Sequence, residues 1–163
     1  MRAAAALDLA VLRLLRTAGH SPASERGIAA YSKLGSHGAV WLVLGGAGMA
    51  LDTGRRRCFR RATAAVVGAY ALNTALKLAI GRRRPELPGL PPLVGTPTAL
   101  SFPSAHATTS FAGAGALGGL LPSPPLYALA ATLALSRPWL GVHYPSDVLA
   151  GAALGALIGR AAR

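Results

Sequence analysis

Three short clusters of polar residues lie between long apolar stretches of this sequence, and each contains groups that can bind or transfer phosphate. In chain order their residues are Lys77, Arg84 and Pro85; then Pro103, Ser104, Ala105 and His106; then Ser136, Arg137, His143 and Asp147. Lys77 supplies a point charge, whereas Arg84 and Arg137 supply planar guanidinium forks that match phosphate oxygens. The residue types therefore predict a site that holds a phosphate group.

The second and third clusters add the groups that a reaction needs. Ser104 lies where a helix N-cap is expected, so the amides of Ala105 and His106 would point from a helix N-terminus toward an anion. Asp147 follows His143 by four residues and could orient its imidazole. For nucleophilic and acid catalysis, the two histidines must begin in opposite protonation states, one neutral and one charged.

Helices must bring these clusters together. Stretches 35–51 and 62–81 are long and apolar enough to span a membrane, and the sequence predicts three further helices, at 104–121, 126–136 and 146–160. If successive helices alternate in direction, the three clusters meet at one membrane face. The sequence thus predicts an all-α membrane bundle of about five spanning helices. The last two stretches are short for a full crossing, which favours a recessed loop over 137–145.

Two connecting segments complete this arrangement. The arginine-rich segment 52–61 joins the first two spans and must lie outside the hydrocarbon. The segment 82–103 contains six prolines, which rule out a continuous helix and favour an irregular, site-bearing loop. Lys77 and Arg84 are seven residues apart and would share a helix face if the helix continued that far.

The spacing of the three clusters resembles the type 2 phosphatidic acid phosphatase family over about residues 70–150. The pattern is Lys77-x6-Arg84-Pro85, then Pro103-Ser104-Ala105-His106, then Ser136-Arg137-x5-His143-x3-Asp147. The resemblance implies a helical membrane fold, a phosphohistidine mechanism and no metal or other cofactor. In outline this chemistry is shared with glucose-6-phosphatase and the vanadium haloperoxidases.

The resemblance also implies a role for each residue of the pattern. It makes His143 the nucleophile, Asp147 the group that orients it, and His106 the acid that protonates the leaving oxygen. The phosphate ligands would be Lys77, Arg84, Ser104, Ala105 and Arg137. Ala105 stands where the family usually has glycine, so the amide is kept while a methyl group narrows the pocket.

Several substrates fit this resemblance. A short, apolar chain favours a lipid phosphate over a soluble sugar phosphate. Within the family, the Pro-Ser-Ala-His motif and the arginine- and alanine-rich composition are similar to the actinobacterial phosphatases of decaprenylphosphoryl-5-phosphoribose, which act in the synthesis of cell-wall arabinan precursors. A polyprenyl pyrophosphate is the second candidate, and phosphatidic acid or phosphatidylglycerophosphate the third. A non-catalytic lipid-phosphate binder, a transporter and a haloperoxidase are the rival functions.

Composition limits the other classes of function. The chain has 163 residues, of which 52% are hydrophobic and only 13% charged, about half the ~25% typical of soluble domains. A formal net charge of +12 could suggest a nucleic-acid partner, but the basic residues separate apolar runs and form no stripe, so no nucleic-acid partner is expected. Cys58 is the single cysteine, which excludes a disulfide framework.

We expect one membrane phosphatase domain over 1–163, with an amphipathic N-terminal segment over 1–31 and a transmembrane core over 35–163. Residues 3–19 predict an interfacial helix, with a packed extra span as the alternative. Because the arginine loop 52–61 lies opposite the polar clusters, the positive-inside bias predicts a multi-pass protein of the cell membrane whose site faces away from the cytoplasm.

A few remaining residues have simpler interpretations. Gly151, Gly155 and Gly159, like Gly115 and Gly119, recur every four residues, which favours close helix packing within the bundle over a homo-oligomer face. Asn73, one turn before Lys77, is expected to form an interhelical hydrogen bond. The sequence predicts no catalytic or binding role for three further residues, because none has a matching partner: His20, Lys33 and His37.

Overall fold

The computed structural model describes residues 2–163, and in that part of the chain the fold is entirely helical. Its elements are α1 (Arg2–Thr17), α2 (Pro22–Ser32), the 3-10 helix η1 (Lys33–Gly38), α3 (Ala39–Leu51), α4 (Arg56–Ile80), α5 (Ala105–Leu117), α6 (Ser123–Trp139) and α7 (Pro145–Ala161). The only extended pairing among the described residues is an isolated bridge between Arg83 and Leu100. The all-α prediction is therefore confirmed.

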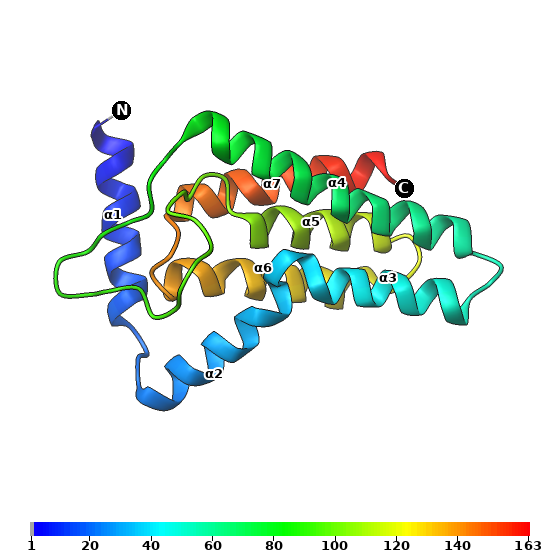
Figure 1. The fold of residues 1–163 in the computed structure, drawn as a ribbon. Helices are drawn as coiled ribbons and strands as arrows, with labels where there is room; N and C mark the ends of the chain where they lie inside the picture. The colour runs from blue at the N-terminus through cyan, green and yellow to red at the C-terminus, as the bar shows by residue number, and fades with distance from the viewer. Residues whose placement is uncertain (1) are drawn as a thin grey trace.

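Helices α3 to α7 run side by side along one axis, whereas α1 crosses one end of the bundle (Figure 1). The central helix is α5, which packs against α4, α6 and α7. A core of large apolar side chains fills the space between them, including Trp41, Phe59 and Leu133, which are at most 2% exposed. The long segment between α4 and α5 and the short turn between α6 and α7 lie at the end that α1 crosses (Figure 1).

Glycines allow α5 and α7 to approach backbone to backbone. A Cβ atom on Gly151 would lie 2.7 Å from the carbonyl oxygen of Ser104, and one on Gly159 would lie 2.9 Å from the Cα of Gly115. Packing within the bundle is therefore confirmed for the glycines of α7 and for Gly115. Gly119 is different, because it lies beyond the end of α5 and has no neighbour near its Cβ position. The glycine face of α7 is already covered within the monomer.

Two helical stretches are long and apolar enough to cross a membrane, namely Pro22–Leu51 and Arg56–Ile80. The first is interrupted at η1, where His37 and Gly38 have positive φ angles of 53° and 75°. Large apolar side chains lie on the outer faces of α3, α4, α6 and α7 and are between 55% and 71% exposed: Val43, Val67, Leu78, Leu135, Leu149 and Leu157. Such a surface suits contact with lipid.

Several predicted boundaries were wrong. Helix α4 begins at Arg56, so most of the arginine-rich segment forms its first turns and does not form a loop. Helix α6 begins at Ser123, because prolines are tolerated in a first helical turn, and it continues to Trp139. Helices α6 and α7 therefore have 17 residues each, and the turn between them is shorter than predicted. The turn is nevertheless buried, because its residue His143 is only 3% exposed.

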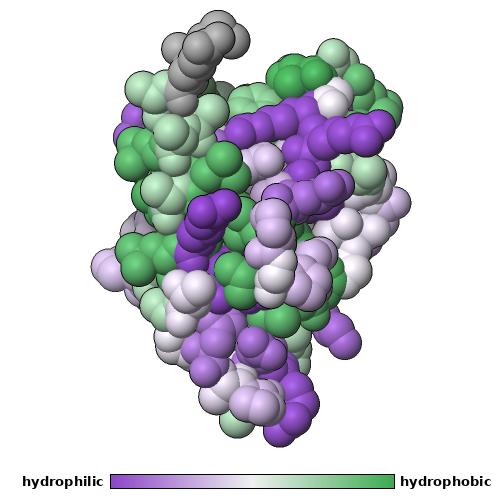
Figure 2. Space-filling view, turned by 90° about the vertical axis from the view of Figure 1, so that its left-hand side faces the viewer, coloured by the Kyte–Doolittle hydropathy of each residue, from purple (hydrophilic) through white to green (hydrophobic). Residues whose placement is uncertain are grey.

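Helix α1 has an unusual distribution of side chains. Asp8, Leu12 and Arg16 face the bundle and are at most 8% exposed, whereas Leu7 and Leu14 face outward and are 66% and 65% exposed. An end-on view shows hydrophobic surface over much of this helix, below the grey terminus, beside a hydrophilic region (Figure 2). An apolar outer face on a helix that crosses the bundle end favours the interfacial interpretation over an additional span.

Candidate active site

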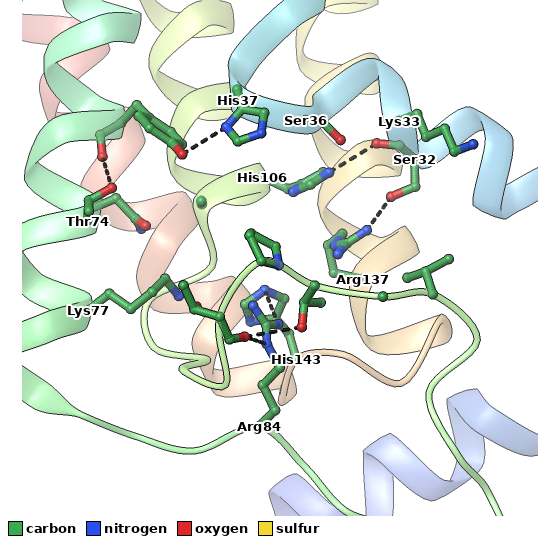
Figure 3. Close-up of a pocket in the computed structure, with 18 of the residues that line it drawn as sticks. Ser32, Lys33, Ser36, His37, Thr74, Lys77, Arg84, His106, Arg137 and His143 are labelled. Carbon is green, nitrogen blue, oxygen red and sulfur yellow. Dashed lines mark hydrogen bonds between the residues drawn. The ribbon is translucent and has the colours of Figure 1, made fainter.

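The structure brings the three polar clusters to one end of the bundle, around a cavity of about 500 Å³. Lys77 enters from α4, His106 from α5 and Arg137 from α6, while Arg84 and His143 come from the adjoining loops (Figure 3). Ala105 lines the same cavity, whereas Ser104 and Asp147 lie behind its wall and are completely buried. A cavity of this volume is large enough for a small polar headgroup.

Arg84 reaches the cavity from the loop that follows α4. Helix α4 ends at Ile80, and Gly81 terminates it with a positive φ of 68°. The helix does not continue as far as Arg84, so Lys77 and Arg84 do not share a helical face. The chain instead turns back on itself, with the amide of Arg84 donating to the carbonyl of Ala99 at 3.0 Å. The loop 82–103 is thus an ordered wall of the site.

The guanidinium group of Arg84 is fixed by the protein before any ligand binds. Its Nε donates to the carbonyl oxygen of Thr98 at 2.8 Å, and one terminal nitrogen donates to that of Val142 at 2.6 Å. The same terminal nitrogen lies 3.2 Å from Nε2 of His143. Because a guanidinium can only donate, Nε2 must accept in this contact and carries no proton.

The tautomer of His143 follows from that contact. With Nε2 unprotonated, the neutral ring carries its proton on Nδ1, which faces Oδ2 of Asp147 at 3.5 Å. This distance is longer than a well-formed hydrogen bond, and Nδ1 has no other partner in the described structure. Burial lowers the pKa of His143 to about 4, and its neighbour Asp147 opposes the shift. His143 is therefore neutral at physiological pH, with a lone pair on the atom nearest the cavity cations.

His106 has a different environment from His143. Its Nε2 lies 3.0 Å from the carbonyl oxygen of Ser32, at the junction of α2 and η1 (Figure 3). Because a carbonyl oxygen can only accept, Nε2 carries a proton and Nδ1 is the nitrogen that can exchange one with a ligand. Nε2 of His143 thus faces a hydrogen-bond donor, whereas Nε2 of His106 faces an acceptor. Different partners of this kind are what a nucleophile and an acid need.

The remaining cations are held by neutral groups. Lys77 is 9% exposed and donates from Nζ to the carbonyl oxygens of Pro103 and Leu100, at 3.0 and 3.3 Å. Arg137 is 7% exposed, donates to the hydroxyl of Ser32 at 2.7 Å, and has a buried Nε without a partner. In the described part of the chain, neither these two residues nor Arg84 forms an ion pair with a carboxylate. Three desolvated positive charges around one cavity favour an anionic ligand.

Ser104 occupies the predicted N-cap position of α5, but its hydroxyl forms no capping bond. The Oγ atom is completely buried and has no hydrogen-bond partner among the described residues. Its backbone amide donates to the carbonyl oxygen of Asp147 at 3.0 Å, which joins the second and third clusters directly. An unpartnered hydroxyl beside the first amides of α5 is a group that a bound anion could satisfy.

Sequence reasoning missed part of the cavity. Lys33 and His37 line it, although no partner for either residue is evident in the sequence. Nδ1 of His37 lies 2.8 Å from the hydroxyl of Tyr70 on α4. The signal that could have found Lys33 is its rarity, because it and Lys77 are the only lysines of the chain and both face one cavity. His20, in contrast, bonds to Glu25 outside this cavity.

Asn73 behaves as predicted and links helices. Its Nδ2 donates to the hydroxyl of Thr108 on α5 at 2.9 Å and to the carbonyl oxygen of Pro103 at 3.2 Å. The side chain is completely buried. It therefore holds α4 against the beginning of α5, where Lys77 and His106 face the cavity.

Comparison with known proteins places this geometry in a wider context. Residues 60–163 match the PAP2 superfamily. The chain is 42% identical over 137 residues to decaprenylphosphoryl-5-phosphoribose phosphatase of Mycobacterium tuberculosis (strain ATCC 25618 / H37Rv), covering 84% of this chain and 76% of the relative.

Two crystal structures have similar folds. A transmembrane PAP2-type phosphatidylglycerolphosphate phosphatase from Bacillus subtilis has a TM-score of 0.81 at 26% identity, covering 99% of this chain and 85% of that one. LpxE of Aquifex aeolicus has a TM-score of 0.82 at 26% identity, covering 96% and 94%.

Proposed function

Because the chain belongs to the PAP2 superfamily and is a membrane-bound lipid phosphate phosphatase, we propose that its substrate is a lipid-linked sugar phosphate, decaprenylphosphoryl-5-phosphoribose. The observation that supports phosphoryl transfer at this site is the group of three cations that surround the cavity of the two histidines without a carboxylate partner in the described chain: Lys77, Arg84 and Arg137. They supply the fixed positive charge that phosphoryl transfer requires.

The proposed reaction has two steps. In the first, Nε2 of His143 attacks phosphorus and the ester P–O bond breaks. His106, in its doubly protonated imidazolium form, gives the proton on Nδ1 to the leaving sugar oxygen and keeps the proton on Nε2. In the second, Nδ1 of His106 takes a proton from water, whose oxygen attacks the phosphorus of the phosphohistidine. The P–N bond breaks, which restores neutral His143 and releases inorganic phosphate. The phosphate must replace Nε2 as the acceptor of the Arg84 terminal N–H when substrate arrives, which frees the lone pair of the nucleophile for attack.

The cavity wall beyond His106 supports a sugar as the group next to the phosphate. It is lined by polar side chains from η1 and α4, among them Lys33, Ser36, His37, Tyr70 and Thr74. Hydroxyl and imidazole groups suit the hydroxyls of a ribose, and Lys33 suits the second phosphate of a phosphodiester to the lipid. Phosphatidic acid and polyprenyl pyrophosphate have no sugar beside the scissile phosphate. Of the three candidate substrates, the sugar phosphate can therefore form the most polar contacts with this wall.

The decisive experiment measures phosphate release by purified protein from a panel of lipid phosphates. The panel contains decaprenylphosphoryl-5-phosphoribose, a polyprenyl pyrophosphate and phosphatidic acid, with His143→Ala as the inactive control. We expect the highest kcat/KM on the sugar phosphate. A higher kcat/KM on pyrophosphate or phosphatidic acid would overturn the substrate assignment, and equal release by His143→Ala would overturn the nucleophile.

The same preparation tests the cofactor requirement. We expect chelators to leave activity unchanged and vanadate to inhibit competitively, because five-coordinate vanadate resembles the transition state of phosphoryl transfer. Activity that is lost in chelator and restored by a divalent cation would contradict the metal-independent reaction.

We also propose that the site faces away from the cytoplasm. The arginines at the start of α4 and those at the C-terminus share the opposite end, where Arg61 donates to the carbonyl oxygen of Ala161 at 3.0 Å. A cluster of arginines at one membrane face favours the cytoplasmic side. Cys58 is exposed at that end, so a membrane-impermeant thiol reagent should not label it in intact cells. Labelling without permeabilisation would reverse the orientation.

A further inference from the structure

Helix α1, which precedes the residues matched by the PAP2 superfamily, contributes a carboxylate to the region behind the nucleophile. Asp8 is only 8% exposed, and its Oδ2 accepts from one terminal nitrogen of Arg82 at 2.8 Å. Its Oδ1 accepts from the backbone amide of Ser146 at 2.9 Å, in the first turn of α7. Asp8 therefore caps the helix that carries Asp147, from more than 130 residues away in the sequence.

Arg82 connects Asp8 with Asp147. Its other terminal nitrogen donates to Oδ1 of Asp147 at 2.8 Å, and its guanidinium lies 4.1 Å from the ring centroid of Tyr144. The second oxygen of Asp147, Oδ2, accepts from the amide of Tyr144 at 2.9 Å and faces His143. Both oxygens of this completely buried carboxylate are thus fixed, one through a cation that Asp8 holds from the other side.

The charges of this chain of contacts explain why a second carboxylate is needed. Arg82 alone would neutralise Asp147, and an aspartate so neutralised attracts the Nδ1 proton of His143 less strongly. Asp8 shares the charge of Arg82 and so preserves the negative charge of Asp147. Burial of Asp8 opposes ionisation, but the hydrogen bonds from Ser146 and Arg82 outweigh it and lower the pKa of Asp8. Asp8 is therefore an anion at neutral pH.

We propose that Asp8 is a positioning residue of the active site, which acts through Arg82 on Asp147 and thereby sets the orientation of His143. This proposal rests on the proposed function, since it assumes that His143 is the nucleophile. It gives α1 a role in catalysis as well as in membrane contact. Arg16, one of the other inward residues of α1, supports the same role because it donates to the carbonyl oxygen of Pro91 at 2.8 Å and so holds the loop that carries Arg84.

The test compares Asp8→Asn with Asp52→Asn. Asp52 is a matched control, because it also pairs with an arginine, Arg55, but at the opposite end of the bundle. Activity is measured on the best lipid phosphate of the panel, with kcat and KM determined separately. We expect Asp8→Asn to lower kcat by about 10-fold to 100-fold, as for outer partners of an oriented histidine, with KM within about twofold. Asp52→Asn should match the wild type.

A double-mutant cycle separates positioning from mere support of the fold. Single turnovers of radiolabelled substrate are followed over hours in Asp147→Asn and in Asp8→Asn/Asp147→Asn. If Asp8 acts through Asp147, its substitution changes the rate by less than about twofold once Asp147 is neutral. A full, additive loss in this background would mean that Asp8 supports the structure only, and the proposal would be wrong.

Arg82→Lys provides a second, independent variant should Asp8→Asn fold poorly. A lysine has one nitrogen and cannot bridge two carboxylates in the geometry of a guanidinium fork. We expect the same loss of kcat, with KM kept. Normal kcat in Arg82→Lys, or in well-folded Asp8→Asn, would overturn the proposal while leaving the proposed function intact. An inactive wild-type protein on every lipid phosphate would instead overturn the proposed function.

Discussion

Substitution of Arg84 provides a quantitative test of the phosphate cradle. Its Nε and one terminal nitrogen are bound to the carbonyl oxygens of Thr98 and Val142, which aims the fork at the cavity. A bound phosphate would receive about two charge-assisted hydrogen bonds from the remaining donors, one of them replacing the contact with Nε2 of His143. Each such bond contributes about 1.5–3 kcal/mol.

The magnitude follows from these contacts. Loss of both bonds in Arg84→Met would raise the barrier by about 3–6 kcal/mol, which corresponds to a fall in kcat/KM of between about 10²-fold and about 10⁴-fold. Arg84→Lys keeps the charge, but a single nitrogen cannot bind both carbonyls and the phosphate together. We expect it to lie between the wild type and Arg84→Met, with a loss of at least about tenfold.

The assay measures phosphate release in detergent micelles over a range of lipid phosphate concentrations. Arg83→Met is the matched control, because the neighbouring arginine is exposed and lies outside the cavity lining. Its kcat/KM should stay within about twofold of the wild type. A loss of less than twofold in Arg84→Met, or an equal loss in Arg83→Met, would refute the assignment of Arg84 as a phosphate ligand.

Three further predictions test other parts of the structure. His106→Ala should reduce turnover of a phosphate monoester much more than that of a pyrophosphate, because only the poorer leaving group needs a proton; equal losses on both substrates would remove His106 from the acid role. Because burial keeps the pKa of His143 near 4, its ring stays neutral at every pH above that value. The rate at which an imidazole-directed reagent modifies His143, measured by mass spectrometry, should therefore be constant between about pH 5 and about pH 8. A midpoint near the ~6.5 of free imidazole would contradict the lowered pKa. Gly155→Ala should reduce the free energy of unfolding by about 1–3 kcal/mol, because its Cβ would lie 2.9 Å from the amide nitrogen of Ala112. Gly68→Ala on α4 is the control and should not reduce it, because no atom lies near its Cβ position. Equal melting temperatures of the two variants in detergent would refute the packing argument.

The sequence alone indicated the three polar clusters of the candidate site and the end of the bundle at which they meet. Apolar stretches of helical length fix a membrane bundle, because backbone polar groups in lipid must bond within helices. Their alternating direction then places Lys77, His106 and His143 at one face without knowledge of any side-chain contact. Helix ends were predicted less well, because the prolines at 124 and 125 lie in the first turn of α6, whereas the expected helix begins after them, at residue 126.

Only the tertiary structure decided how the site is held together. The rarity of lysine is a sequence signal for Lys33, but no local pattern indicates that His37 lines the same cavity as Lys77. His37 lies at the break in the helix at η1, which motif spacing does not reveal. Likewise, Asp8 and Asp147 are joined through Arg82 by contacts between segments far apart in the chain. Periodicity and motif spacing indicate local geometry and the type of charge at each position. Contacts between distant segments depend instead on the path of the loops and on the angle at which α1 crosses the bundle. Packing of the whole molecule sets both.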